Sequence, residues 1–525
     1  MKKLIPSAIA LVHWGLIYIL QIDKLYFRYE QENWLTYIIK GFTLIVLLIF
    51  YNFLFWIVKR SKLEGGRYTR GIKIFAANFC LQMVILFFLW PGTWSLDDVN
   101  VLGSIQVYRI RAWQHVLTNF YQMVLLQILP FPAGIIILQC VIISICVAFC
   151  IIKLEKQMQL PVLKHAVADM ILKLCPFFLP PVIMYQMSGY RMGLYIFLEY
   201  VLLVILLCAA MEKQKWSWNY TLFVGVLSAI VCTWRTEGII FVPFVVLILC
   251  ISNKKVGKRQ VCLATFIMIF GVLGITKIQN SFLPGTGYEL ITTARPCTAL
   301  VRATHEDEDK TQLDVIDKVI NVDVILENPT MNGEELYWNC GLVQNGYSKE
   351  DYHKYLDALI RLGLKYPKVL IGERLSVFAE SIGLGEQSTA AIIPLSSELL
   401  DYPYTNGYAE KFAGFEAIFS DSWNTDVRKS VIHILGMQKQ DGQSGMLYRI
   451  FWSSVVPILA ILVALIYEIK KKNLSKSLLL FAVFLQLAAV FIAEPGGWPM
   501  YVLSTYMIGY VIIIYELLIH WKGKN

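Results

Sequence analysis

The chain has 525 residues, of which 57% are hydrophobic and only 16% charged, with a formal net charge of +9. A soluble globular protein carries about 25% charged residues, so this composition excludes a water-soluble fold for the whole chain. The basic residues cluster in short loops between apolar blocks. That placement is typical of topology determinants facing anionic lipid, not of a nucleic-acid-binding surface.

The hydrophobicity comes in blocks of about 17–23 residues, the length that crosses a bilayer. Because backbone polar groups in lipid must be satisfied internally, each block predicts a helix. The first block is expected to be retained, since no small-residue cleavage site follows it. The sequence therefore predicts a mainly α, multi-pass membrane protein of about twelve spans, at residues 4–20, 35–58, 72–90, 132–152, 166–187, 192–211, 218–234, 237–252, 260–279, 449–469, 475–492 and 498–520.

Every second loop between these blocks is basic, in unbroken phase along the chain. Since cytoplasmic loops carry the excess of Lys and Arg, both termini are predicted to be cytoplasmic. Residues 281–448 are then extracytoplasmic, and they hold 24 acidic and 14 basic residues. We expect a location in the cell membrane.

The spans divide the chain into four predicted parts. Residues 1–71 hold two spans and a basic loop, and residues 72–280 hold seven spans. Within the latter, the loop 91–131 predicts two short helices, at 97–109 and 113–129, that lie in the membrane interface. Residues 281–448 predict an extracytoplasmic domain, α/β or mainly helical, and residues 449–525 hold three spans.

In the extracytoplasmic domain the sequence predicts helices at 314–325 and 349–365. The same domain holds two cysteines, Cys297 and Cys340. An oxidising compartment would allow a disulfide between them.

Two carboxylates, Asp97 and Asp98, directly follow the span 72–90 and a Pro-Gly pair. Ionisable groups at the membrane rim are costly and are therefore functional candidates. Asp98 could act as a general base toward a hydroxyl group, or the pair could hold a divalent cation with a substrate phosphate. The alternative is a helix cap, with Ser95 or Asp97 opening the next helix.

Three further outer-loop positions are candidates for substrate binding. His115 could contact a phosphate or a sugar hydroxyl, or be structural. Arg191 and Arg235 lie in short outer loops, where guanidinium groups suit bidentate phosphate contacts. The alternative for Arg235 is an ion pair with Glu237.

The last outer turn contributes Glu494 and Tyr501, which flank a Gly-Gly-Trp sequence. Glycines and aromatics at such a rim suit carbohydrate stacking, or an ordinary turn with aromatic anchors at the membrane surface. The sequence shows no phosphate-binding loop, dinucleotide fingerprint or zinc-ligand spacing.

Four segments carry a family resemblance: PGTWSLDD at 91–98, WQHVLTNF at 113–120, WRTEGIIFVP at 234–243 and GGWPMYVLSTY at 496–506. The chain resembles the GT-C superfamily of membrane glycosyltransferases, and within it bacterial multi-pass members of the dolichyl-phosphate-mannose–mannosyltransferase-like group. The resemblance implies that residues 72–280 form a seven-span module with interfacial helices in its first outer loop.

The resemblance also implies a function at the cell envelope. The donor would be a polyprenyl-phosphate sugar with its phosphate near Arg191 or Arg235, and Asp98 would deprotonate the acceptor hydroxyl, with inversion at the sugar carbon. The acceptor would be a glycan, a lipid or a protein. Two departures leave metal use open: Val116 replaces a proline after His115, and Arg191 stands where relatives carry a lysine–aspartate pair.

Three other classes compete with this interpretation. A lipid-linked glycan polymerase or ligase would carry its key residues in the large outer domain. A transporter or flippase would show broken helices with paired charges near the bilayer midplane. A non-catalytic envelope scaffold would not bring residues 98, 191 and 235 together.

Overall fold

A computed structural model of the chain describes residues 4–29, 32–64, 66–212, 214–283, 288–385, 422–437 and 445–522. Within these ranges the chain is mainly helical, and β-pairing is limited to one isolated bridge between Ile320 and Val343. Eight of the described helices are long and apolar enough to cross a membrane, or up to nine if a bent pair counts as one span. A mainly α, multi-pass membrane protein is thereby confirmed.

The eight long spans match eight of the predicted blocks. They are α2 (Trp34–Glu64), α3 (Gly66–Leu89), α6 (Pro132–Gln157), α9 (Met192–Ala209), α13 (Lys258–Ser281), α23 with α24 (Met446–Phe451 and Val455–Lys470), α25 (Leu474–Ala493) and α26 (Leu503–Lys522).

The other four predicted spans are helical but shorter or bent, so the count of twelve stays a prediction. Three are short: α1 (Ile5–Ile19), α10 (Trp218–Trp234), and η4 (Thr236–Ile240) with α11 (Phe241–Ile251). The fourth bends by 72° between Ala166–Phe178 and Pro180–Gln186. Prolines at 176, 180 and 181 explain the break, because proline removes a backbone donor and clashes with the preceding turn. This segment comprises α7 (Ala166–Leu174), η3 (Cys175–Phe178) and α8 (Pro180–Gln186).

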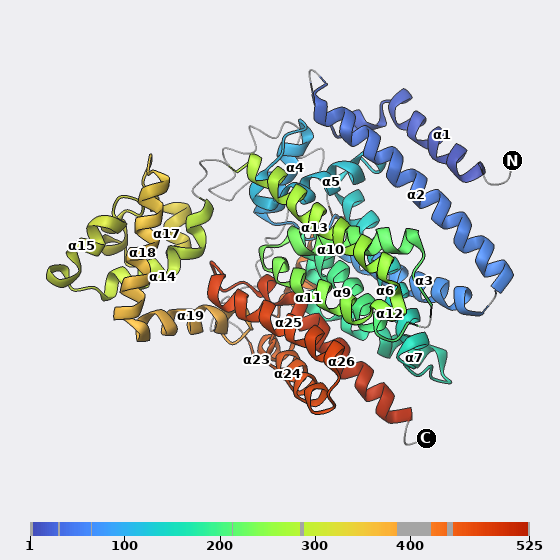
Figure 1. Cartoon of the computed structure of the whole chain (residues 1–525). Helices are drawn as coiled ribbons and strands as arrows, with labels where there is room; N and C mark the ends of the chain where they lie inside the picture. The colour runs from blue at the N-terminus through green and yellow to red at the C-terminus, as the bar shows by residue number, and fades with distance from the viewer. Residues whose placement is uncertain are drawn as a thin grey trace.

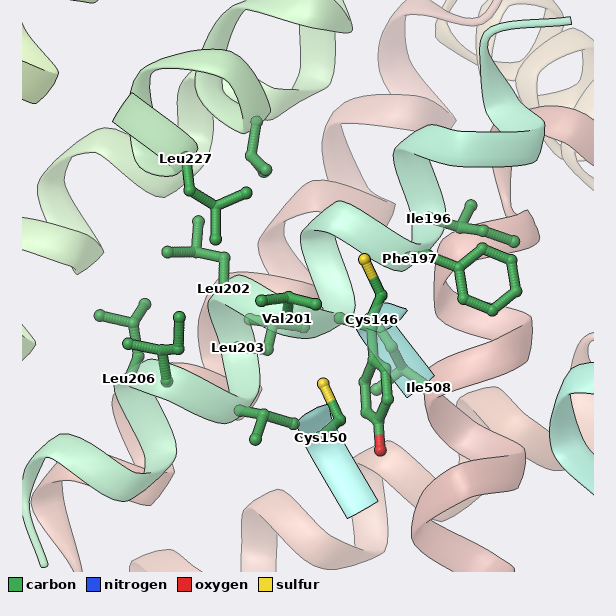
Figure 2. Close-up of a cluster of buried hydrophobic side chains, with 14 of the residues drawn as sticks. Cys146, Cys150, Ile196, Phe197, Val201, Leu202, Leu203, Leu206, Leu227 and Ile508 are labelled. Carbon is green, nitrogen blue, oxygen red and sulfur yellow. The ribbon is translucent and has the colours of Figure 1, made fainter. Parts of the chain in front are cut away.

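Helix α9 lies at the centre of the bundle, in contact with α6, α8, α10, α11, α25 and α26. Figure 2 shows how its apolar side chains meet those of its neighbours: Phe197, Val201, Leu202 and Leu206 lie with Cys146 and Cys150 of α6, Leu227 of α10 and Ile508 of α26. Because lipid is as apolar as leucine, this close packing rather than water exclusion holds the spans together.

The loop after α3 forms two short helices, as predicted: α4 (Leu96–Gln106) and α5 (Val116–Ile128), joined by η2 (Ala112–Gln114). The polar side chains of α5, however, are buried against the protein, including Thr118, Asn119 and Gln122. Gln122 donates to the carbonyl of Gly189 at 2.8 Å. Helix α5 is therefore an internal support for the loop 188–191.

A separate group of helices occupies one end of the molecule (Figure 1). It comprises η5 (Tyr288–Leu290), α14 (Ile291–Ala303), α15 (Glu306–Ile316), α16 (Val322–Glu327), α17 (Gly333–Asn339) and α18 (Lys349–Lys365), and α19 (Pro367–Ser381) joins it to the bundle. The start of α1 and the end of α26 lie at the opposite end. We call these the domain-side end and the terminus-side end.

The described part of this domain is helical, and α18 has the predicted bounds. The single helix predicted over 314–325 is instead two helices. Helix α15 ends at Ile316. The side chain of Asp317 accepts from Val322 N and that of Asn321 accepts from Val324 N, and these two hydrogen bonds start a new helix, α16. The cysteines Cys297 and Cys340 are both free thiols.

Part of the predicted domain returns to the spans. Helix α22 (Thr425–Gly436) contacts α3 and α8. Arg428 donates to the carbonyls of Leu89 and Gly92, at 3.2 and 2.7 Å, and the indole of Trp423 donates to Phe87 O at 2.8 Å. Residues 386–421 of the predicted domain lie outside the described residues. The short elements η1 (Ile22–Leu25), α12 (Asn253–Val256) and η6 (Pro499–Tyr501) are the remaining elements of the described ranges.

Candidate functional site at the domain-side end

The loop that carries the two aspartates is fixed by close backbone contacts. Gly92 has a φ of +120°, and a Cβ there would lie 2.7 Å from the carbonyl oxygen of Met187. Thr93 donates its backbone N–H to the same oxygen at 2.7 Å. The start of α4 is thus held against the end of α8.

Asp98 belongs to the helix cap. Ser95 is the N-cap of α4, and its Oγ accepts from Asp98 N at 3.3 Å. In return, Oδ2 of Asp98 accepts from the backbone N and the hydroxyl of Ser95, at 3.0 and 2.9 Å. Burial raises the pKa of Asp98 to about 7, the charge of Asp97 adds to this rise, and the Ser95 hydrogen bonds oppose it.

Asp97 faces the positive charges of the site instead. It is only partly buried, next to the guanidinium groups of Arg191 and Arg111 and the amide of Gln114. Burial raises the pKa of Asp97, whereas Arg191, Arg111 and Gln114 oppose that rise. Of the two adjacent carboxylates, Asp97 is the one placed beside cations.

Arg191 directly precedes α9, at the end of a tightly packed loop. A Cβ on Gly189 would lie 2.5 Å from the Trp94 ring, so only glycine fits there. The Nε of Arg191 is buried and has no hydrogen-bond partner among the described residues. The phenol of Tyr190 lies within electrostatic range of Arg191, Asp97, Arg235 and Asp98, so the loop brings these four charges together.

Arg235 follows α10 and is 2% exposed. Its Nε pairs with Oε1 of Glu237 at 2.7 Å, and its guanidinium carbon lies 5.3 Å from the centroid of the Tyr501 ring. The alternative interpretation of an Arg235–Glu237 ion pair is therefore confirmed. Within the described ranges, Nη1 of Arg235 is nevertheless buried without a hydrogen-bond partner.

His115 caps α5, and its Nδ1 accepts from the backbone N–H of Leu117 at 3.3 Å. Burial lowers the pKa of His115 to about 3, and the charge of Arg191 adds to the effect. The ring is therefore neutral near pH 7. Because Nδ1 accepts, the proton belongs on Nε2, which is then a hydrogen-bond donor.

Helix α17, in the separate group of helices α14–α18, contacts the same end of the bundle. The ring of Trp338 meets Trp113 edge-on at 5.2 Å, and Arg111 lies 4.5 Å from the Trp113 ring. The Trp498 indole donates to both oxygens of Glu334 at 3.1 Å. Burial raises the pKa of Glu334, the Trp498 hydrogen bond and the charge of Arg295 oppose that rise, and the charge of Asp97 adds to it, so Asp97 lies within electrostatic range of Glu334.

Glu494 lies in a different setting, where α19 contacts α25. Its Oε2 accepts from the Ser381 hydroxyl at 2.6 Å, and its backbone carbonyl accepts from Arg374 at 2.8 Å. Burial raises the pKa of Glu494 to about 8, while Ser381, Arg374 and Arg295 oppose the rise. Glu494 is thus tied to the junction between α19 and α25 and not to the aspartates.

Three residues of functional interest were not predicted from the sequence. Glu334 and Trp338 enter through the docking of α17, for which the sequence carries no local signal. Glu199 is buried in α9, and the signal was present, because it is the one charged residue in the predicted span 192–211. For metals, the part of the chain that the structure describes shows no group of three or more His, Cys, Asp or Glu side chains that could hold an ion.

Comparisons with protein-family models, with curated proteins and with solved structures find no match to this chain. The resemblance to the GT-C superfamily therefore stands on the four sequence segments alone.

Proposed function

We propose that this chain is an integral membrane glycosyltransferase that moves a sugar from a polyprenyl-phosphate donor to an acceptor hydroxyl at the domain-side end. One observation carries the proposal: a partly buried carboxylate, Asp97, lies beside Arg191 and Arg111, while N–H groups of Arg191 and Arg235 are buried without partners among the described side chains. The sequence resemblance supplies the class of donor.

The unpartnered N–H groups, at Nε of Arg191 and Nη1 of Arg235, suit a phosphate. A buried donor without an acceptor is costly, so such groups are expected to receive a ligand. Guanidinium groups bind phosphate oxygens through parallel hydrogen bonds, which are stronger than neutral ones. Arg191 and Arg235 would hold the donor phosphate and stabilise the negative charge that it gains as the leaving group.

The geometry favours Asp97 over Asp98 as the general base. Oδ2 of Asp98 already accepts two hydrogen bonds from Ser95, whereas Asp97 faces the arginines. In the proposed step, the acceptor oxygen bonds to the anomeric carbon while the bond from that carbon to the phosphate oxygen breaks. Asp97 takes the acceptor proton, polyprenyl phosphate leaves, and the configuration inverts.

The arrangement of the ends agrees with a reaction outside the cytoplasm. The start of α1 and the end of α26 both lie on the side of the bundle away from helices α14–α18 (Figure 1). Positively charged loops face the cytoplasm, so the proposal places both termini there and the site on the outer face of the cell membrane. The acceptor would be a glycan, a lipid or a protein hydroxyl.

The test uses purified protein in proteoliposomes with labelled polyprenyl-phosphate sugars and cell-envelope acceptors. Removing a general base typically costs at least about 100-fold in rate, so Asp97→Asn should lose transfer by that factor. Asp98→Asn and Ser95→Ala should lose about 1 kcal/mol of stability and keep most turnover, because they disturb a cap. Asp357→Asn, on the exposed face of α18, is the control.

Normal turnover in Asp97→Asn together with loss in Asp98→Asn would return the base role to Asp98. If the wild-type protein transfers no label from any polyprenyl-phosphate sugar, the enzymatic proposal is wrong.

A transporter or flippase is the second candidate, favoured by the 72° break after η3 and by the buried Glu199. Broken helices and intramembrane charges are features of transporters. The same proteoliposomes discriminate between the two. A transporter moves the labelled lipid between leaflets without an acceptor, whereas the transferase consumes it only when an acceptor is present.

A further inference from the structure

Glu199 is the one charged side chain in α9, and it is fully buried. Its helix neighbours Phe197 and Val201 belong to the apolar cluster of Figure 2. An ionisable group at such a position is costly and is retained for a function or a partner.

The partners of Glu199 are neutral. Its Oε2 accepts from Gln486 Nε2 of α25 at 3.1 Å, and Ser504 of α26 faces the same carboxyl group. The ion pairs found in the described ranges do not include Glu199. Its Oε1 and the Oγ of Ser504 are both buried, and neither has a hydrogen-bond partner in the described part of the chain.

We infer that Glu199 is a proton-binding site inside the membrane and is held there as a neutral carboxylic acid. An ionised carboxylate without a cation is strongly unfavourable in a low-dielectric interior. A proton taken from water onto Oε1 makes that oxygen a donor, and the Ser504 hydroxyl becomes its acceptor. The proton gives both orphan atoms a partner and also removes the buried charge, which donation by the Ser504 hydroxyl to an ionised carboxylate would not do.

The site is connected to the domain-side end through Tyr195. Tyr195 lies one turn before Glu199 on α9, and its hydroxyl donates to Val231 O at 3.3 Å. The same hydroxyl lies 3.0 Å from the Cβ position of Gly238, the residue after Glu237. Glu199 lies within electrostatic range of Glu237, and Cys232 of α10 also faces it.

Loss of the proton would add a second negative charge near the Arg235–Glu237 pair. The protonation state of Glu199 is therefore coupled to the charges of the candidate site. This coupling does not depend on the proposed transfer reaction.

Infrared spectroscopy of the full chain in lipid tests the inference. The difference spectrum between wild type and Glu199→Gln near neutral pH should show loss of the carbonyl band of a protonated carboxyl group. Thermal stability should stay close to wild type, since glutamine reproduces a neutral side chain. Glu212→Gln is the control: its carboxylate pairs with Lys153 at 2.9 Å, so the ionised carboxylate bands should be lost instead.

A difference spectrum in which Glu199→Gln loses ionised carboxylate bands would overturn the inference. So would stabilisation of the wild type by sodium that Glu199→Gln abolishes, because the site would then hold a metal cation. Ser504→Ala provides a second variant, which removes the proposed acceptor and should shift the carbonyl band. An unshifted band would contradict the assigned hydrogen bond.

Discussion

The two ends of the bundle hold their buried charges in opposite ways. At the terminus-side end, Arg70, Glu155, Asp169 and Lys173 form a closed network in which each acid contacts both bases. At the domain-side end, Arg191 and Arg235 keep N–H groups without partners among the described residues. A closed network satisfies its charges by itself, whereas an open one leaves donors for a ligand.

This difference distinguishes buried charges that stabilise the fold from buried charges that are available to a ligand. Lys173 is 1% exposed and contacts Glu155 at 2.7 Å and Asp169 at 2.8 Å, and Asp169 also accepts from the backbone of Leu163. The network joins α3, α6 and α7, so it fixes spans to one another. The open set lies in the loops that follow α8 and α10.

The largest expected effect is on the closed network. Removing one partner of a buried ion pair typically costs about 3–5 kcal/mol, because it leaves charge uncompensated. Arg70→Ala should therefore lower the thermal unfolding temperature strongly. The fraction of the variant that remains folded should keep the wild-type rate of the proposed transfer reaction per molecule. Lys59→Ala, an exposed residue of the same end, is the control. If Arg70→Ala is as stable as wild type but inactive, the closed network has a functional role, and the contrast between the two ends of the bundle is wrong.

A smaller effect, on binding, is expected for Arg191→Gln. Hydrogen bonds to charged groups contribute about 1.5–3 kcal/mol, so the KM for the proposed polyprenyl-phosphate donor should rise roughly 10- to 100-fold. Stability should not fall, since the variant removes an unpartnered donor. Arg109→Gln, between α4 and α5 at the same end of the bundle, is exposed and should behave as wild type. A destabilised variant with unchanged KM would assign Arg191 to the fold.

The smallest effect concerns Glu494 and pH. Burial raises the pKa of Glu494 from its ordinary 4.5 to about 8. Between these values the unfolded chain loses the proton and the folded chain keeps it, so stability falls as pH rises toward about 8. Glu494→Gln cannot ionise, so its unfolding temperature should exceed that of wild type by a few degrees at about pH 9 and match it at about pH 5.

The control for Glu494 is Glu350→Gln, an exposed residue paired with Lys354. If Glu494→Gln and wild type show the same pH slope, the carboxyl group is ionised in the folded protein and the junction with α19 is electrostatically different from that described.

The sequence was sufficient to predict the helical blocks, because span length and apolar composition are local properties. It also predicted the two short helices after α3, the Arg235–Glu237 pair as an alternative, and the position of α18. The break within 166–187 was not predicted, although its three prolines are a local signal for it. The prediction of a single helix at 314–325 was wrong because the side chains of Asp317 and Asn321 cap the start of a second helix. Hydrophobic periodicity does not reveal such contacts.

The candidate site was only partly predictable. That Asp97 and Arg191 lie together depends on the docking of Gly189 against Trp94, a contact between residues 95 positions apart. The division of roles between Asp97 and Asp98 depends on which carboxylate turns back to Ser95. Glu334 and Trp338 reach the site only through the placement of α17, which no local pattern encodes.

The contact of Arg428 with the end of α3 has a consequence for biogenesis. Its hydrogen bond to Leu89 O joins residues 339 positions apart, and the one to Gly92 O joins residues 336 apart. The ribosome must therefore translate about four-fifths of the chain before the carbonyls at the end of α3 receive this donor. Until then the carbonyls of Leu89 and Gly92 lack this donor, so the loop that carries Asp97 completes its packing long after it has been translated.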